Sequence, residues 1–185
     1  LPNAETVEPD TKLGLDDMFE LVRKADEDYR TLQEKKEKLK QKIEEYRAKQ
    51  QIVAPFRPLE CDLHRVLHYR YITYRFGRIA VEFYHKMQKY LMDDLKAIFV
   101  EGERDESYVY GVYFVSQAET QKVDAVFRSL HFERIELKDE FEGTPDTAYR
   151  VLENEIARVN LEIEDLDKQA GEMLADRAPQ LVAAR

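Results

Sequence analysis

Apolar residues recur at alternating intervals of three and four positions near both ends of the chain. The first series predicts a helix over about residues 16–51, and the second predicts another over about 145–177. This spacing is typical of the seam of a coiled coil. The seam positions are Leu15, Met18, Val22, Ala25, Tyr29, Leu32, Lys36, Leu39, Ile43, Tyr46, Gln50 and Val53, then Tyr149, Leu152, Ile156, Val159, Ile163, Leu166, Ala170 and Met173.

Helix-terminating residues bound both predicted helices, each of which would be roughly 50 Å long. Pro55 and Pro58 end the first, and Thr144 and Pro145 suit the N-cap and first position of the second. Each helix carries one narrow apolar stripe, so we expect the two to pack against each other in antiparallel fashion. The alternative is two separate helices lying on a globular body.

The middle of the chain predicts a β-α-β-β-α-β order. Strands are expected over residues 68–76, 96–101, 108–115 and 132–137, with Gly77 ending the first. Helical stripes run through Ile79, Phe83, Met87, Tyr90 and Leu91, and through Val123, Val126, Phe127 and Leu130, and Leu59, Leu63, Val66 and Leu67 suggest a short helix. The fold class is therefore α+β, a ferredoxin-like lobe at the tip of a long antiparallel two-helix coiled coil, with both lobe helices on one sheet face.

This interpretation divides the chain into five segments. They are an irregular lead-in over 1–14, a first coiled-coil helix over 15–53, an α/β distal lobe over 54–143, a returning coiled-coil helix over 144–178 and a tail over 179–185.

Composition narrows the functional classes. The 185 residues include only six Gly and six Pro, which argues against a β-sandwich with many turns. The net charge of −9 argues against general nucleic-acid binding. The sequence contains no run of about 18 apolar residues, the length needed to span a bilayer, and we find no signal-peptide pattern at its start. A first residue of Leu1 rather than Met indicates a processed chain or a piece of a longer one.

Candidate chemistry is confined to one short stretch. His64 and His68 are four residues apart, as zinc ligands can be, with Cys61 and Asp62 nearby. The alternative is an ordinary hydrogen-bonded pair at the end of a short helix, and Cys61 is expected to be a partly buried thiol rather than a nucleophile activated by His64. We predict no catalytic, cofactor-binding or metal-binding residues and no cofactor, and we leave partner-binding residues unassigned.

Two further patterns leave alternatives open. Strand 108–115 loosely resembles the central motif of an RNA-recognition domain, but Glu106 and Ser107 stand where a basic residue and a glycine belong. An open sheet face could instead cover protein. The run over 34–42 mixes lysines with glutamates, which favours a solvated helix face over contact with an anionic membrane or an acidic partner helix.

An ordered set of motifs resembles the cytoplasmic N-terminal half of subunit I (subunit a) of V-type rotary ATPases, also called A-type ATP synthases. The resemblance covers about residues 15–178. The motifs are Gly77-Arg78-Ile79, Tyr108-Val109-Tyr110-Gly111-Val112, the decapeptide Arg128–Leu137 (RSLHFERIEL) and Phe141-Glu142-Gly143-Thr144-Pro145.

The resemblance implies a non-catalytic stator at the cytoplasmic face of the membrane, as the soluble part of an integral membrane subunit. It would link the peripheral-stalk heterodimers to the membrane half, which carries the proton or sodium channel. The resemblance implies neither nucleic acid nor a small molecule as a ligand. The chain departs from the family pattern by lacking its opening strand and helix and all membrane helices. The alternative function is a coiled-coil scaffold or adaptor with a ferredoxin-like interaction lobe, and an enzyme ranks last.

Overall fold

The computed structural model of the chain describes residues 11–138 and 140–183, with side-chain surroundings for 14–138 and 140–177. The fold is α+β, as predicted. It contains two compact units: a pair of helical segments, 11–44 and 157–183, and a sheet-containing unit over 45–156. We call the first the helix pair and the second the lobe.

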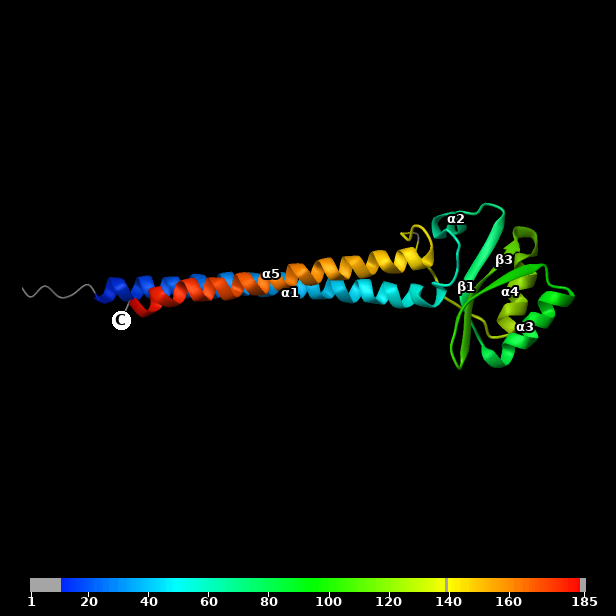
Figure 1. The fold of residues 1–185 in the computed structure, drawn as a ribbon, viewed down its shortest axis with the longest axis horizontal. Helices are drawn as coiled ribbons and strands as arrows, with labels where there is room; N and C mark the ends of the chain where they lie inside the picture. The colour runs from blue at the N-terminus through cyan, green and yellow to red at the C-terminus, as the bar shows by residue number, and fades with distance from the viewer. Residues whose placement is uncertain (1–10, 139, 184–185) are drawn as a thin grey trace, which may run out of the picture. The chain divides into compact units, whose positions relative to one another are not determined.

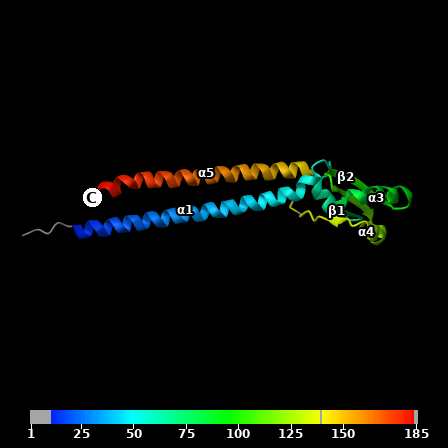
Figure 2. The ribbon, with the colours of Figure 1, turned by 90° about the horizontal axis from the view of Figure 1, so that it is seen from below.

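Two long helices dominate the element order. Helix α1 spans Thr11–Val53 and helix α5 spans Pro145–Ala183 (Figure 2). The helix α1 begins inside the segment 1–14 that was predicted to be irregular, whose first ten residues lie outside the described part. The helix α5 continues past Pro179, and the remainder of the predicted tail, 184–185, also lies outside the described residues.

The start of α5 follows the predicted capping pattern. The side-chain oxygen of Thr144 accepts a hydrogen bond from the Thr147 amide at 3.1 Å, and the Ala148 amide donates to the Thr144 carbonyl at 2.9 Å. Pro145 takes the first helical position, where its missing amide proton costs nothing. The helix therefore begins where the capping pattern predicts.

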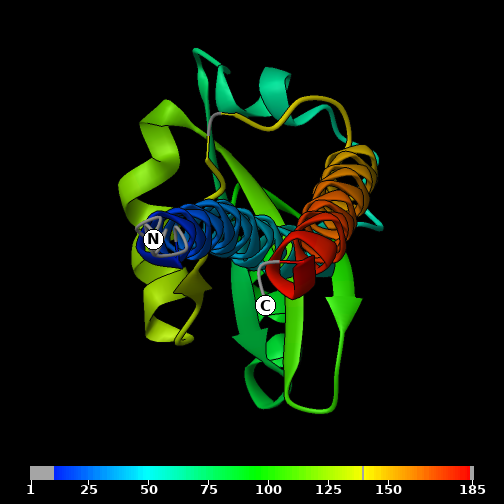
Figure 3. The same cartoon turned by 90° about the vertical axis from the view of Figure 1, so that its left-hand side faces the viewer.

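The helix pair is antiparallel, as expected. The ammonium of Lys36 lies 2.6 Å from Asp167, and the guanidinium of Arg177 lies 2.6 Å from Asp28, so rising numbers on α1 face falling numbers on α5. Figure 3 shows the two helices end-on. Burial along the seam is uneven: Ile43, Val159 and Ala170 are buried, whereas the seam residues Leu15, Val22 and Tyr29 are exposed.

The lobe contains a four-stranded antiparallel sheet in the order β2-β3-β1-β4. This order and the intervening helices confirm the predicted split-βαβ arrangement. The elements are α2 (Leu63–Leu67), β1 (Ile72–Ala80), α3 (Val81–Asp93), β2 (Ala97–Arg104), β3 (Tyr108–Ser116), α4 (Thr120–Ser129) and β4 (Glu133–Arg134), with short 3-10 turns η1 at Ala54–Phe56 and η2 at Gln117–Glu119.

The prediction that Gly77 ends the first strand is wrong. Gly77 does not end the strand but lies in its middle, paired with Gly111 of β3 and Arg134 of β4. A side chain at Gly77 would collide with the ring of Phe132, 2.5 Å from the position of a Cβ atom. The glycine is thus a place where another part of the chain comes close, and not a strand terminator.

Strand β4 is shorter than the predicted 132–137. It pairs with β1 through Glu133 and Arg134, and the Ile135 amide still donates to the Phe76 carbonyl at 2.8 Å. Leu137 and Phe141 then enter a core cluster on one face of the sheet. The chain thus leaves the ladder after Ile135 and continues into this core.

Both faces of the sheet are covered within the lobe. Helices α3 and α4 pack on one face, against Ile79, Val109, Tyr113 and Val115 (Figure 1). On the other face Phe76 and Val112 belong to a cluster with residues from the end of α1, η1, the segment between η1 and α2, α2 itself and the start of α5: Val53, Phe56, Leu59, Leu63, Val66, Ala148 and Leu152. The expectation of an open sheet face is therefore wrong for this part of the sheet.

Candidate functional site

The predicted histidine pair lies at the two ends of α2. Asp62 caps this helix, because its carboxylate accepts a hydrogen bond from the Arg65 amide at 3.1 Å. The rings of His64 and His68 lie 4.5 Å apart, and Nδ1 of His68 is 2.7 Å from the His64 carbonyl oxygen. One ring nitrogen of His68 is thus engaged by the backbone of its own helix.

The neighbouring side chains do not complete a metal site. In the described part of the chain, no three His, Cys, Asp or Glu side chains gather in a way that could hold a metal ion. Cys61 is half-buried, and this burial raises the pKa of its thiol. A raised pKa disfavours the thiolate, which is the nucleophilic form. Cys61 is thus a half-buried thiol, and the histidine pair next to it in the sequence is bonded through the backbone of its own helix.

The aromatic face that raised the RNA alternative is occupied by the protein itself. Tyr110 and Phe76 lie on the sheet face that η1 covers, and the ring of Phe56 meets both, with centroids 6.3 and 5.2 Å away in edge-to-face geometry. Rings packed in this way are not free to stack on bases. The aromatic pattern of strand 108–115 serves the core of the lobe.

Two networks of charged residues connect the edge strand β4 to the rest of the lobe, and no spacing pattern along the chain predicts them. In the first, Arg78 donates to Glu133 at 2.7 Å and lies over the ring of Tyr108, 3.8 Å from its centroid. Hydrogen bonds to Tyr110 and Glu133 raise the pKa of the Arg78 guanidinium, which stays fully charged.

The second network centres on Asp124 of α4. Its carboxylate accepts a hydrogen bond from the Tyr113 hydroxyl at 2.7 Å and pairs with Arg75 at 3.3 Å and Arg134 at 3.1 Å. Burial and the hydrogen bond to Asp124 raise the pKa of Tyr113. Each partner comes from a different element, so only the folded lobe brings the four side chains together.

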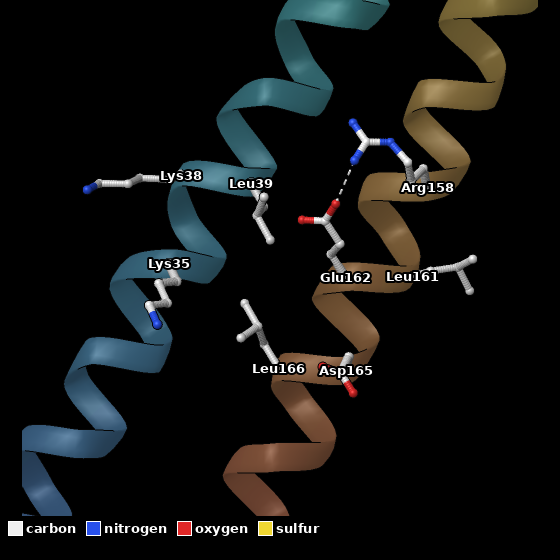
Figure 4. A pocket seen from close by; sticks show the side chains of 8 residues that line it. All are labelled: Lys35, Lys38, Leu39, Arg158, Leu161, Glu162, Asp165 and Leu166. Carbon is white, nitrogen blue, oxygen red and sulfur yellow. Dashed lines mark hydrogen bonds and ion pairs between the residues drawn. The ribbon is translucent and has the colours of Figure 1, made fainter.

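A concave surface lies on the helix pair. A groove of about 640 Å³ is lined by Lys35, Lys38, Leu39, Arg158, Leu161, Glu162, Asp165 and Leu166. Figure 4 shows Leu39 and Leu166 pointing into the space between the helices. Leu161 is 65% exposed although it is large and apolar. The groove is open and apolar at its floor, which is typical of a surface that receives another helix rather than a small substrate.

None of the helices in the described part of the chain combines the length and the apolarity that a membrane crossing requires. The two structural features on which a function can rest are the long antiparallel helix pair and the ferredoxin-like lobe.

Neither a protein-family model nor a curated protein sequence matches this chain. Among solved structures, it is similar to the crystal structure of the cytoplasmic N-terminal domain of subunit I, homolog of subunit a, of V-ATPase. The TM-score is 0.49 at 12% sequence identity, over 96% of this chain and 70% of that chain. At this identity the similarity concerns the fold alone.

Proposed function

We propose that the chain is a stator component of a V-type ion-translocating rotary ATPase or ATP synthase, a non-catalytic cytoplasmic part that links peripheral stalks to the membrane half. The observation that carries this proposal is the ordered set of subunit I-like motifs between two antiparallel heptad helices. The antiparallel helix pair and the ferredoxin-like lobe, which the resemblance implies for residues 15–178, support this proposal.

The quoted motifs contact one another in the lobe, although they are far apart in sequence. Gly77 from the first motif pairs with Gly111 from the second, and the ring of Phe132 from the third lies against Gly77. Arg78 bonds to Glu133, and Phe141 from the fourth motif is buried in the core. The motif set is therefore one packing arrangement, and its joint presence supports the resemblance more strongly than any motif alone.

The helix pair suits a mechanical role. A stator transmits torque and performs no chemistry, so it needs elements that resist stretching along their length. Backbone hydrogen bonds within two long helices supply that resistance, and the ion pairs Lys36–Asp167 and Asp28–Arg177 oppose sliding of one helix past the other.

A binding assay with the cognate peripheral-stalk heterodimer tests the proposal. We expect association with a dissociation constant on the order of tens of micromolar or below. The complete cytoplasmic half of the same subunit serves as the positive control, and Phe127→Asp, which disrupts the lobe core, is expected to weaken any binding through the lobe. Failure of this chain to bind while the complete half binds would contradict the proposal.

The reading frame gives a second test. If the proposal is right, the gene encodes several apolar stretches of about 20 residues downstream of this segment, which form the membrane half. A frame without such stretches would instead favour the scaffold or adaptor function.

A further inference from the structure

We propose that the groove on the helix pair binds the same groove of a second copy of this chain, forming a four-helix dimer in which α1 of each copy runs antiparallel to α5 of the other. This inference does not depend on the stator function. It rests on the exposed apolar surface of the groove and on the opposite charges of its two sides.

The apolar surface is the first part of the argument. Leu39 and Leu166 form the floor of the groove, and Leu161 on α5 is 65% exposed. The helix pair buries few apolar side chains. Leucines at the floor of its groove that stay open to water therefore favour coverage by another helix. Figure 4 shows the floor residues projecting between the two backbones.

The charged side chains along the groove indicate that its partner is a second copy of the chain. The α1 side carries Lys35 and Lys38, neither of which forms an ion pair with any other described residue, and both are exposed. The α5 side carries Glu162 and Asp165, with Arg158 already bonded to Glu162 at 3.0 Å. One side of the groove is thus basic and the other has an acidic excess, so the groove is electrostatically complementary to itself.

Symmetry determines which arrangement uses this complementarity. A two-fold axis parallel to the helices places α1 of one copy over α5 of the other, so that Lys35 and Lys38 meet Glu162 and Asp165 twice. The Lys36–Asp167 ion pair shows that these residues already lie at the same level along the pair. An axis perpendicular to the helices, in the plane of the interface, would bring lysines against lysines and is disfavoured.

The size of the contact predicts a weak, salt-sensitive dimer. Contact over about 30 Å of the helix pair, which is roughly 20 residues of each helix, and about 20 Å across would bury roughly 600 Å² per copy, close to the lower limit for specific association. Charges at the rim of such an interface are screened by salt. We expect dimerisation at low ionic strength and at least a tenfold weakening near 0.5 M salt, where the Debye length falls to about 4 Å.

Charge reversal provides the test, by sedimentation velocity on the full chain. The variants K35E/K38E and E162K/D165K are each expected to be monomers, because each brings like charges together at both contacts. An equimolar mixture restores full complementarity and should form a heterodimer. The control Lys40→Glu changes a lysine of α1 that does not line the groove, and should dimerise like the unaltered chain.

Leu161→Lys keeps the test decisive if a charge variant fails to fold. Because Leu161 is exposed within its own chain, this change should preserve helicity and still weaken dimerisation at least tenfold. A chain that stays monomeric at about 100 μM and low salt overturns the proposal. Two reversed variants that still form homodimers, or whose mixture stays monomeric, also overturn it.

Discussion

At the scale of single residues, two facing glycines decide how the lobe packs. Gly77 and Gly111 are directly opposite each other in β1 and β3, and each accepts an aromatic ring where a side chain would otherwise stand. The ring of Phe132 lies at Gly77, and the ring of Phe99 lies at Gly111. Glycine is needed here for space, and the strand keeps its extended conformation through both positions.

We therefore predict that Gly77→Ala destabilises the chain. The new methyl group would overlap the Phe132 ring and the Glu133 backbone, at a cost of about 1–3 kcal/mol for overpacking. Gly171→Ala is the matched control, because nothing lies near a Cβ atom in the middle of α5, and helix propensity should stabilise it by about 0.5–1 kcal/mol. Urea unfolding followed by circular dichroism measures both, and equal effects would contradict this account of Gly77.

Tyr113 is the residue whose ionisation links stability to pH. Its pKa is raised in the folded state by burial and by the bond to Asp124, so the folded chain holds this proton more tightly than the unfolded chain. The stabilisation is complete below the ordinary tyrosine pKa of about 10 and is lost as the pH rises through the folded value.

We expect Tyr113→Phe to reduce the loss of stability between about pH 9.5 and 11.5, because phenylalanine has no proton to lose. At neutral pH the same variant should be less stable by about 1 kcal/mol or more, since Asp124 loses a hydrogen bond. Denaturant unfolding across this pH range is the measurement, with the exposed Tyr71→Phe as control. An unchanged alkaline slope for Tyr113→Phe would show that this hydroxyl is not the linked group.

At the scale of elements, the seam between the long helices is not uniformly buried. Ile43 on α1 is 5% exposed, while Leu15 in the same heptad series is 48% exposed. The heptad pattern is the same at both positions, but the ion pairs Lys36–Asp167 and Asp28–Arg177 place Ile43 opposite a described part of α5, whereas this register brings no described side chain of α5 opposite Leu15. Burial, rather than the pattern, determines how much each seam residue stabilises the pair.

The substitution Ile43→Ala should accordingly cost about 2–4 kcal/mol, the range for removing a large buried aliphatic side chain. Leu15→Ala removes a side chain of the same size from an exposed position, and its effect should stay within about 0.5 kcal/mol. Thermal unfolding of the two variants side by side compares them. Similar losses at both sites would mean that the seam is closed along its whole length.

At the scale of the whole molecule, buried residues are distributed unequally between the two units. Both core clusters lie in residues 45–156, whereas the described side chains of the helix pair include only Ile43, Val159 and Ala170 in the buried class. Regions with few buried apolar contacts open at a lower free energy than the core of a domain.

We therefore predict two classes of amide protection in native-state hydrogen exchange. Amides in strands β1 and β3 should exchange most slowly, and those near residues 15–30 and 165–177 much faster, despite the high helix content there. Dimerisation through the groove would slow exchange around residues 35–39 and 158–166 at high protein concentration. A single uniform protection level would contradict the division into two units of different stability.

The sequence by itself determined the long helices, the capped start at Thr144 and the order of the sheet elements, because heptad spacing, strand alternation and capping chemistry are local patterns. The two narrow apolar stripes predicted the antiparallel pairing of the helices, and the ion pairs between α1 and α5 confirm it. Tertiary structure alone decided the continuation of β1 through Gly77, the early end of β4, the coverage of the second sheet face and the assembly of Arg75, Tyr113, Asp124 and Arg134. The physical reason is that each of these depends on which distant side chain approaches a given backbone. Local periodicity carries no information about that approach.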